Sequence, residues 1–372
     1  MLCTGLAAAL FTTSFAQEAH NVTDKLQNAD MEKGVIGWDL TFESNVWKKQ
    51  SKSSAGYHGV DGFCVENWQS STTTGLTDNS ISQSLTGLPN GTYVFGAYLV
   101  AALGGDAVEN KDVVEGVYLF ANEIELPVAT NWPAYEGVKW SHSAKFNVAV
   151  NVIDGTLKVG MKAQGTNANC LLMDNATLYY FGEMEAADAL SEMAKIDIAA
   201  SVAVAEALAE QKMSVDSLNL LNEGIENAKK MASADEAYQV NEDIWWTIGI
   251  ARKSVEDYRS FSETIAEVKA VAEKEWSADV ATALEYLNEL IAQAESIYEG
   301  GLADRLTLQA LQAEMVEAAA YVELDNAYVR WAELDEEIVP NLEVGNGLGE
   351  YSEDMVIRIL ELMEEVFGCI ER

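Results

Sequence analysis

Apolar and polar residues alternate through the first half of the chain. The clearest runs cover residues 146–152 and 157–163, with Asp154 and Gly155 between them. Side chains alternate between the two faces of a strand, and an Asp-Gly pair favours a tight turn. The pattern therefore predicts a β-hairpin.

A second pair of runs covers residues 81–86 and 93–99, on either side of turn residues 89–91. Residues 114–126 follow as a further strand. Many short strands before residue 183 predict an all-β sandwich, because two sheets packed face to face bury the apolar side of each strand.

The spacing becomes helical after Gly182, where Ala, Glu, Leu and Met dominate. The element Leu-Asn-Glu-x-Ile-x-x-Ala occurs at residues 221–228 and again at 287–294, each time after a Ser-x-Asp helix start. No proline interrupts residues 234–275 or 306–339. The third helix of one bundle is therefore expected to continue into the first helix of the next.

These patterns predict a multidomain chain. An all-β jelly-roll sandwich over residues 23–183 is followed by all-α three-helix-bundle repeats over 184–258 and 259–323, and by an incomplete repeat over 324–372. The apolar stripe of the last helix is wide enough to need two partner helices. This predicts either a truncated chain or self-association through this helix. The stripe comprises Val356, Ile359, Leu360, Met363, Val366 and Phe367.

Residues 1–16 have the features of a secretory signal peptide. An apolar run ends at Phe11 and leads to Ser14-Phe15-Ala16, which supplies the small residues that signal peptidase requires. The run lacks a preceding Lys or Arg, so either the start codon is assigned too late or the sequence begins inside the signal. We expect a secreted, periplasmic or cell-surface protein.

The net charge of -37 excludes several partners. Most of the acidic excess follows residue 184, and no basic stripe is present to attract phosphates, so nucleic acid and anionic lipid surfaces are not expected as partners. No apolar run after the signal approaches bilayer thickness, so no membrane span is expected. The acidic residues are read as solvated helix faces.

Sequence motifs of catalysis are absent. No GxSxG, HExxH, P-loop or GxGxxG occurs, and His58 and His142 have no nucleophile motif nearby. We therefore expect a protein that is not an enzyme. Cys64 and Cys170 fall in one predicted domain, and the sequence leaves open whether they form a disulfide.

Three segments resemble the galactose-binding-like β-sandwiches of carbohydrate-binding modules. They are Asn-Ala-Asp-Met-Glu at 28–32, the stretch 81–93 with its Leu-Pro-Asn-Gly-Thr-Tyr end, and Leu-Leu-Met-Asp-Asn at 171–175. The helical half is similar to FIVAR-type repeats, which accompany such modules in secreted glycan-acting proteins. The resemblance implies a non-catalytic carbohydrate-binding module on a helical spacer of an exported bacterial protein.

A sugar site needs an aromatic ring to stack on the apolar face of a pyranose, and amides or carboxylates to bond its hydroxyls. Residues 131–140 gather three aromatic residues in one predicted loop, and two further residues are expected at the same rim. The polysaccharide-binding candidates are Trp132, Tyr135, Trp140, Trp47 and Asn67.

The resemblance also places Trp38 and Trp68 in the core. It further implies a structural calcium ion, for which Asp30, Glu32 and Asp174 could supply oxygen ligands. The competing interpretation of these acidic residues is that they are surface or capping groups.

Two other functions stay open from the sequence. The chain could be a structural or protein-interaction module of the cell surface. It could also be the N-terminal fragment of a larger glycoside hydrolase.

The signal peptide gives the first testable prediction. We expect the exported protein to begin near Gln17, because Ser14 and Ala16 satisfy the small-residue requirement of the cleavage site. Mass spectrometry of protein recovered from the periplasm or medium measures this directly. Retention of Met1 would contradict it.

Overall fold

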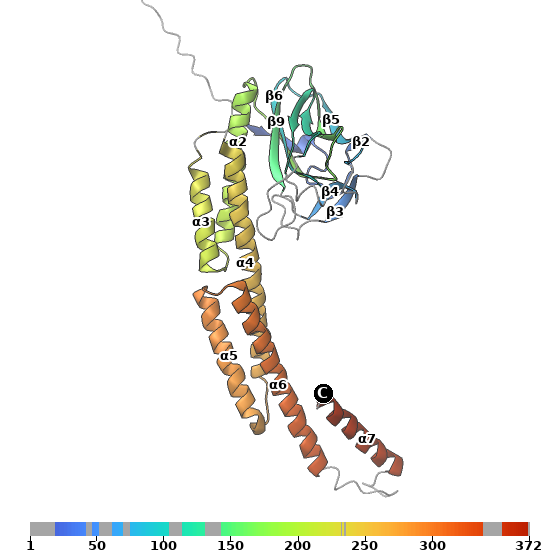
Figure 1. Ribbon diagram of the computed structural model, residues 1–372, viewed down its shortest axis with the longest axis vertical. Helices are drawn as coiled ribbons and strands as arrows, with labels where there is room; N and C mark the ends of the chain where they lie inside the picture. The colour runs from blue at the N-terminus through green and yellow to red at the C-terminus, as the bar shows by residue number, and fades with distance from the viewer. Residues whose placement is uncertain are drawn as a thin grey trace, which may run out of the picture. The chain divides into compact units, whose positions relative to one another are not determined.

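The computed structural model describes residues 19–41, 47–51, 62–69, 75–103, 114–130, 143–231, 233, 236–337 and 352–370. Two antiparallel β-sheets come first in the chain, and a helical region follows (Figure 1). The predicted fold class, a β-sandwich followed by an all-α region, is confirmed.

The larger sheet has the strand order β3-β4-β11-β6-β9, with β1 also paired to β11. These strands are β1 (His20–Asn21), β3 (Trp47–Ser51), β4 (Phe63–Trp68), β6 (Gly91–Ala102), β9 (Ala144–Val152) and β11 (Cys170–Tyr180).

The smaller sheet has the order β2-β5-β10-β7-β8. The short 3-10 helix η1 (Thr23–Lys25) precedes its first strand. The strands are β2 (Asp39–Thr41), β5 (Asn79–Thr86), β7 (Val117–Ala121), β8 (Ile124–Pro127) and β10 (Thr156–Ala163).

The two predicted hairpins contain the right strands with the wrong partners. β9 pairs with β6 in the larger sheet, whereas β10 pairs with β5 and β7 in the smaller one. Asp154 and Gly155 therefore turn a corner between sheets, with Gly155 at a φ of 72° and Asp154 Oδ1 accepting from Thr156 N at 2.9 Å. β5 and β6 are likewise divided between the sheets. Alternation identifies a strand and its apolar face, but it does not name the neighbouring strand.

The single strand predicted over residues 114–126 is also wrong. β7 and β8 form a hairpin whose two-residue turn is Asn122-Glu123. Asn122 has a φ of 51°, a left-handed conformation that Asn tolerates better than most residues. The turn lies between apolar residues and lacks Gly, which is why the sequence pattern did not mark it.

The alternating positions form the interior of the sandwich, as the pattern predicted. One buried cluster takes its side chains from both sheets. Its members include Tyr93, Phe95, Ala97 and Leu99 of β6, and Leu157, Val159, Met161 and Ala163 of β10.

The helices are α2 (Ala186–Ala209), α3 (Val215–Lys229), α4 (Ala237–Ala272), α5 (Ala281–Gly300), α6 (Arg305–Glu337) and α7 (Glu353–Ile370), with the 3-10 helix η3 (Ala278–Val280) before α5. The chain divides into two compact units. Residues up to 204 and residues 225–249 form the first unit, and residues 205–224 and 250–372 form the second.

In the first unit, α2 covers one end of the outward face of the larger sheet (Figure 1). Val94 and Ala149 on the strands, with Phe181 just after β11, pack against Ala189 and Met193 of α2. β6 is consequently buried along most of its length on both faces, as in sheets that are covered on both sides.

Polar side chains hold α2 to the same face. Lys145 Nζ of β9 lies 4.0 Å from Asp197 Oδ1 and donates to Thr177 Oγ1 at 3.0 Å, and Asn147 Nδ2 donates to Asp197 Oδ2 at 2.6 Å. Burial raises the pKa of Asp197 and lowers the pKa of Lys145, and the charge of each opposes the shift in the other. Removal of either partner would leave a buried charge unpaired.

The first part of α4 belongs to the same unit. The ring of Trp245 meets Tyr98 of β6 edge-on, with 6.0 Å between the ring centroids. Ser201 of α2 and Asn241 of α4 are hydrogen-bonded through Oγ and Oδ1 at 2.6 Å. The next residue, Glu242, is buried, and burial together with the charge of Asp243 raises its pKa to about 8.

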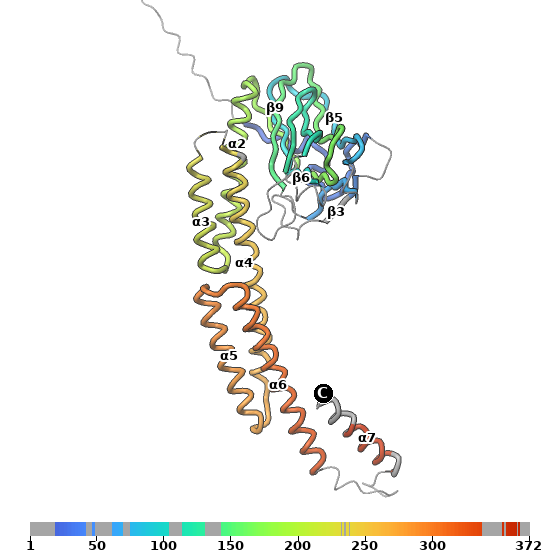
Figure 2. Tube along the Cα trace, in the orientation of Figure 1, coloured from blue at the N-terminus to red at the C-terminus, as the bar shows by residue number. Residues whose placement is uncertain are grey.

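In the second unit, the later part of α4 packs with α5 and α6 around one core (Figure 2). Phe261 of α4, Leu287 and Ala294 of α5, and Met315 and Val322 of α6 are all buried in it. α4 and α6 are uninterrupted, as the absence of proline predicted.

The predicted repeat element marks buried helix positions in both copies. Its Leu, Ile and Ala are buried at Leu221, Ile225 and Ala228 and again at Leu287, Ile291 and Ala294. The two Ser-x-Asp starts before the repeats, and a third Ser-x-Asp triplet at residues 352–354, begin helices, because each serine hydroxyl accepts a backbone N–H. The bonds run to Ser214 Oγ from Ser217, to Ser277 Oγ from Asp279, and to Ser352 Oγ from Met355.

α7 contacts α6 in the second unit. Of its predicted stripe, Val356 and Ile359 are half-buried and Leu360 is exposed, while the side chains of Met363, Val366 and Phe367 lie outside the described part. Among the described helices, none is long and apolar enough to cross a bilayer.

Glu242 gives a pH-dependent prediction. Its pKa rises from the ordinary 4.5 to about 8 on folding, so its stabilising contribution is complete below about 4.5 and is lost as pH rises through about 8. Glu242→Gln should therefore raise the melting temperature at pH 8.5 and change it little at pH 4.5. Thermal melts of both proteins across this range measure the effect. Equal gains at both pH values would contradict a titrating Glu242.

Candidate functional site

β4 presents consecutive side chains to opposite faces of the larger sheet. Val65 belongs to the interior, and Cys64 belongs to a separate cluster with outward residues of β6 and β11. The same alternation turns Asn67 inward and Trp68 outward. Trp68 is 50% exposed and Asn67 is fully buried. The core position expected for Trp68 is therefore wrong, and Asn67 lies inside the sandwich instead of at its rim.

Among the described residues, the sheet neighbours of Trp68 on β11 and β6 are small, and an acidic residue precedes it on the same face of β4. In the strand register Trp68 lies opposite Cys170 of β11, which lies opposite Ala102 of β6. Glu66, two residues earlier on the same face, is buried, and Cys170 Sγ lies 4.0 Å from Glu66 Oε1. We call these four residues the Trp68 patch. A charged residue two positions before Trp68 was the available sequence signal that this face of β4 is not the core.

No disulfide joins Cys64 to Cys170. Both side chains lie on the outward face of the larger sheet, and Cys64 is buried beside Val100 and Leu172. The pairing that the sequence left open is therefore not made.

Trp47 lies in the core instead of at a binding rim. Only 6% of it is exposed, and its indole Nε1 donates to Asn79 Oδ1 at 3.0 Å. A ring packed in this way offers no face to a sugar. Trp132, Tyr135 and Trp140 lie outside the described residues, so their role stays a prediction.

The three predicted calcium ligands each accept a backbone N–H. Asp30 Oδ1 accepts from Glu32 at 3.4 Å, Glu32 Oε1 accepts from Phe63 at 2.9 Å, and Asp174 Oδ1 accepts from Asn175 at 2.8 Å. In the described part of the chain, no group of three or more His, Cys, Asp or Glu is placed to hold a metal ion. These side chains do not form a ligand set by themselves, and calcium binding stays a prediction.

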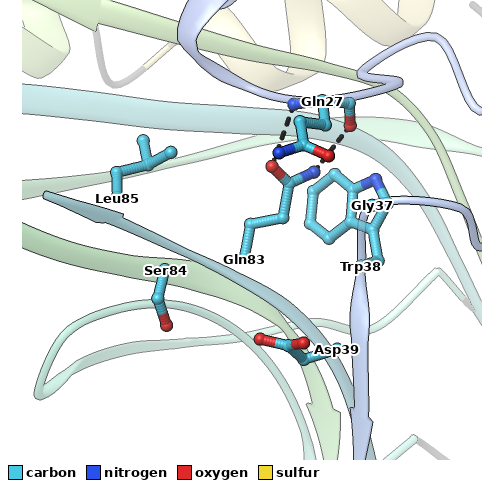
Figure 3. Close-up of a pocket in the computed structure, with 7 residues that line it drawn as sticks. All are labelled: Gln27, Gly37, Trp38, Asp39, Gln83, Ser84 and Leu85. Atoms are coloured by element: carbon cyan, nitrogen blue, oxygen red, sulfur yellow. Dashed lines mark hydrogen bonds between the residues drawn. The ribbon is translucent and has the colours of Figure 1, made fainter.

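A pocket of about 400 Å³ opens where β2 separates from β5 (Figure 3). β2 pairs with β5 only as far as Ser82, so the continuing edge of β5 borders the pocket. The lining residues are Gln27, Gly37, Trp38, Asp39, Gln83, Ser84 and Leu85.

The amide of Gln83 is engaged within the wall of this pocket. Gln27 N donates to Gln83 Oε1 at 2.9 Å, and Gln83 Nε2 donates to Gln27 O at 2.6 Å (Figure 3). Trp38 is only 6% exposed, and its Nε1 donates to Asn28 O at 3.3 Å. The pocket can offer the Asp39 carboxylate and the Ser84 hydroxyl to a ligand, but no aromatic face. The Trp68 patch is therefore the stronger candidate for sugar binding.

Comparison with known proteins places similar structures at the β-sandwich. TmCBM61, solved in complex with beta-1,4-galactotriose, is 16% identical, covers 42% of this chain and 97% of its own, and has a TM-score of 0.30. A family 16 carbohydrate-binding module is 14% identical over 41% of this chain and 98% of its own, with a TM-score of 0.27.

A cyclase from Fischerella sp. TAU, solved in complex with an indole compound, is 11% identical over 45% of this chain and 100% of its own, with a TM-score of 0.32. The similar structures thus include carbohydrate-binding modules and an enzyme, so the function has to be argued from the residues of this chain. No family model and no curated protein matches the sequence.

The calcium hypothesis is tested by chelation. If calcium bridges Asp30, Glu32 and Asp174, EDTA should lower the melting temperature of the full chain and added calcium should restore it, because the ion binds only the folded state. Calorimetry with and without EDTA measures this, with magnesium as the control for ionic strength. Identical melts in EDTA and in calcium would remove the metal from the description of this fold.

Proposed function

We propose that this protein binds a neutral glycan at the Trp68 patch on the outward face of its larger sheet. The helical region would serve as the spacer of an exported, non-catalytic protein. The observation that carries the proposal is the half-exposed ring of Trp68, at a position where the resemblance implied a core residue.

Trp68 differs from the other tryptophans of the described sandwich. Trp38 and Trp47 are each 6% exposed, and both use their indole N–H in hydrogen bonds to the protein. Trp68 keeps half of its surface in water, at the end of β4 where the sheet neighbours Cys170 and Ala102 are small. A large ring beside short side chains leaves room for a flat ligand over the sheet.

The chemistry of this patch suits a sugar. The apolar C–H face of a pyranose stacks on an indole ring, and a carboxylate accepts hydrogen bonds from its hydroxyls. Glu66 carries a carboxylate on the same face of β4 as Trp68, although its side chain is buried beside that ring's end of the strand. A shallow surface of this kind favours binding to a stretch of a polysaccharide chain over enclosure of a single sugar in a pocket.

The charge of the protein narrows the class of glycan. With a net charge of -37, the protein as a whole repels sulfated and uronic acid polymers, although Lys48 of β3 lies opposite Glu66 in the strand register. We therefore propose neutral polysaccharides as ligands.

The test is glycan binding by the full chain and by Trp68→Ala. On an array or in affinity gels carrying neutral and anionic polysaccharides, we expect binding to neutral glycans. Trp68→Ala should weaken it by about tenfold or more, equivalent to about 1.4 kcal/mol, because the stacking surface is lost. Trp68→Phe should retain part of the affinity, and the melting temperature should stay within a degree or two of the wild type.

Ile153→Ala is the matched control, because Ile153 is an apolar residue that is more exposed than Trp68, at 76%, and lies outside the patch. It should leave both affinity and melting temperature unchanged. Full affinity in Trp68→Ala together with loss in Trp132→Ala or Trp140→Ala would move the site to the predicted loop. An absence of binding across the whole array would overturn the glycan function and favour a structural or protein-interaction module.

A further inference from the structure

Asn67 places a full amide group inside the sandwich. It lies on β4 between Trp47 of β3 and Leu171 of β11 in the strand register, and all three residues are buried. Val65, its neighbour on the same face of β4, belongs to the apolar interior. The amide therefore lies among apolar side chains and away from bulk solvent.

Among the described residues, neither polar atom of this amide has a hydrogen-bond partner. Oδ1 and Nδ2 of Asn67 are both buried and both unsatisfied. The group can accept two hydrogen bonds and donate two. The desolvation penalty of an unsatisfied buried amide is larger than the net stability that a typical hydrogen bond contributes. Native proteins therefore rarely contain such a group.

Some other buried polar side chains of the sandwich have hydrogen-bond partners in the protein. Asn79 accepts from Trp47 Nε1 at 3.0 Å and donates to Thr77 O at 2.7 Å. Thr130 Oγ1 accepts from Ala101 N at 2.8 Å and donates to Ala101 O at 2.9 Å. The fold thus provides partners for some polar groups of this interior. Ser82 Oγ and Asn147 Oδ1 are also buried and unsatisfied, but among the described residues Asn67 is the one whose side-chain amide has both of its polar atoms unsatisfied.

We propose that Asn67 holds a hydroxyl-bearing guest in the interior of the sandwich. A hydroxyl oxygen both accepts and donates, so it can satisfy Nδ2 and Oδ1 together. A neutral amide among apolar side chains offers no charge to retain a metal ion or an anion. The guest is a bound water molecule or the hydroxyl of a small polyol, which share this chemistry.

Side-chain amide NMR of the full chain tests the proposal directly. The Nδ2 protons of Asn67 are assigned by their loss in Asn67→Leu. In ligand-free protein they should show cross-relaxation with a long-lived water molecule. If glycerol is added as a polyol probe, persistence of the water contact identifies water as the guest. Replacement of the water contact by contacts to glycerol protons identifies a polyol site.

Asn79 is the matched control, since its amide lies in the same sandwich and already has protein partners. Its protons should show no contact to water or glycerol. If the Asn67 protons also contact only protein protons, with and without glycerol, the proposal is overturned.

Stability provides a second measurement. An amide with no guest would make Asn67→Leu stabilising, because leucine has a similar volume and nothing to desolvate. With a guest in place, this substitution should bring no gain in melting temperature. A rise of about 4 °C or more in Asn67→Leu would overturn the proposal. These measurements need no glycan, so their outcome is independent of whether Trp68 binds one.

Discussion

The larger sheet has to be covered on both faces, and much of the rest of the first unit follows from this constraint. β6 and β11 carry apolar side chains toward the smaller sheet and also away from it. The interior satisfies one face. The other face would expose Val94, Ala149 and Phe181 to water if α2 did not pack there. The first helix of the helical region is therefore part of the packing of the sandwich.

This packing brings charged groups out of water. Lys145 and Asp197 pair across the contact between β9 and α2, and Glu242 of α4 is buried in the same unit. A buried pair adds little net stability, but it makes other alignments of strand and helix costly, because each would leave a charge unpaired. Burial is the largest cause of the shifted pKa values of Lys145, Asp197 and Glu242.

Strand β4 connects the two proposals. Successive side chains of a strand point to opposite faces of the sheet, so the inward position of Asn67 requires Trp68 to point outward. An aromatic ring in water and an amide in an apolar interior both depart from the usual distribution of these residue types. Each departure is explained if the position binds something, a glycan on the outer face and a hydroxyl within.

The sequence by itself determined most of the strands and helices, the change from strands to helices near Gly182, the serine caps and the buried positions of the helical repeat. These features depend on residues close together in the chain, through alternation, helical spacing and local hydrogen bonds. Only the tertiary structure decided that β9 and β10 belong to different sheets, that α2 covers the outward face, and that Lys145 meets Asp197. It also decided which side of β4 is the interior, and so reversed the roles expected for Asn67 and Trp68. A period of two says that neighbouring residues face opposite ways, but the inside is defined by which segments pack against the strand, and those are distant in the sequence.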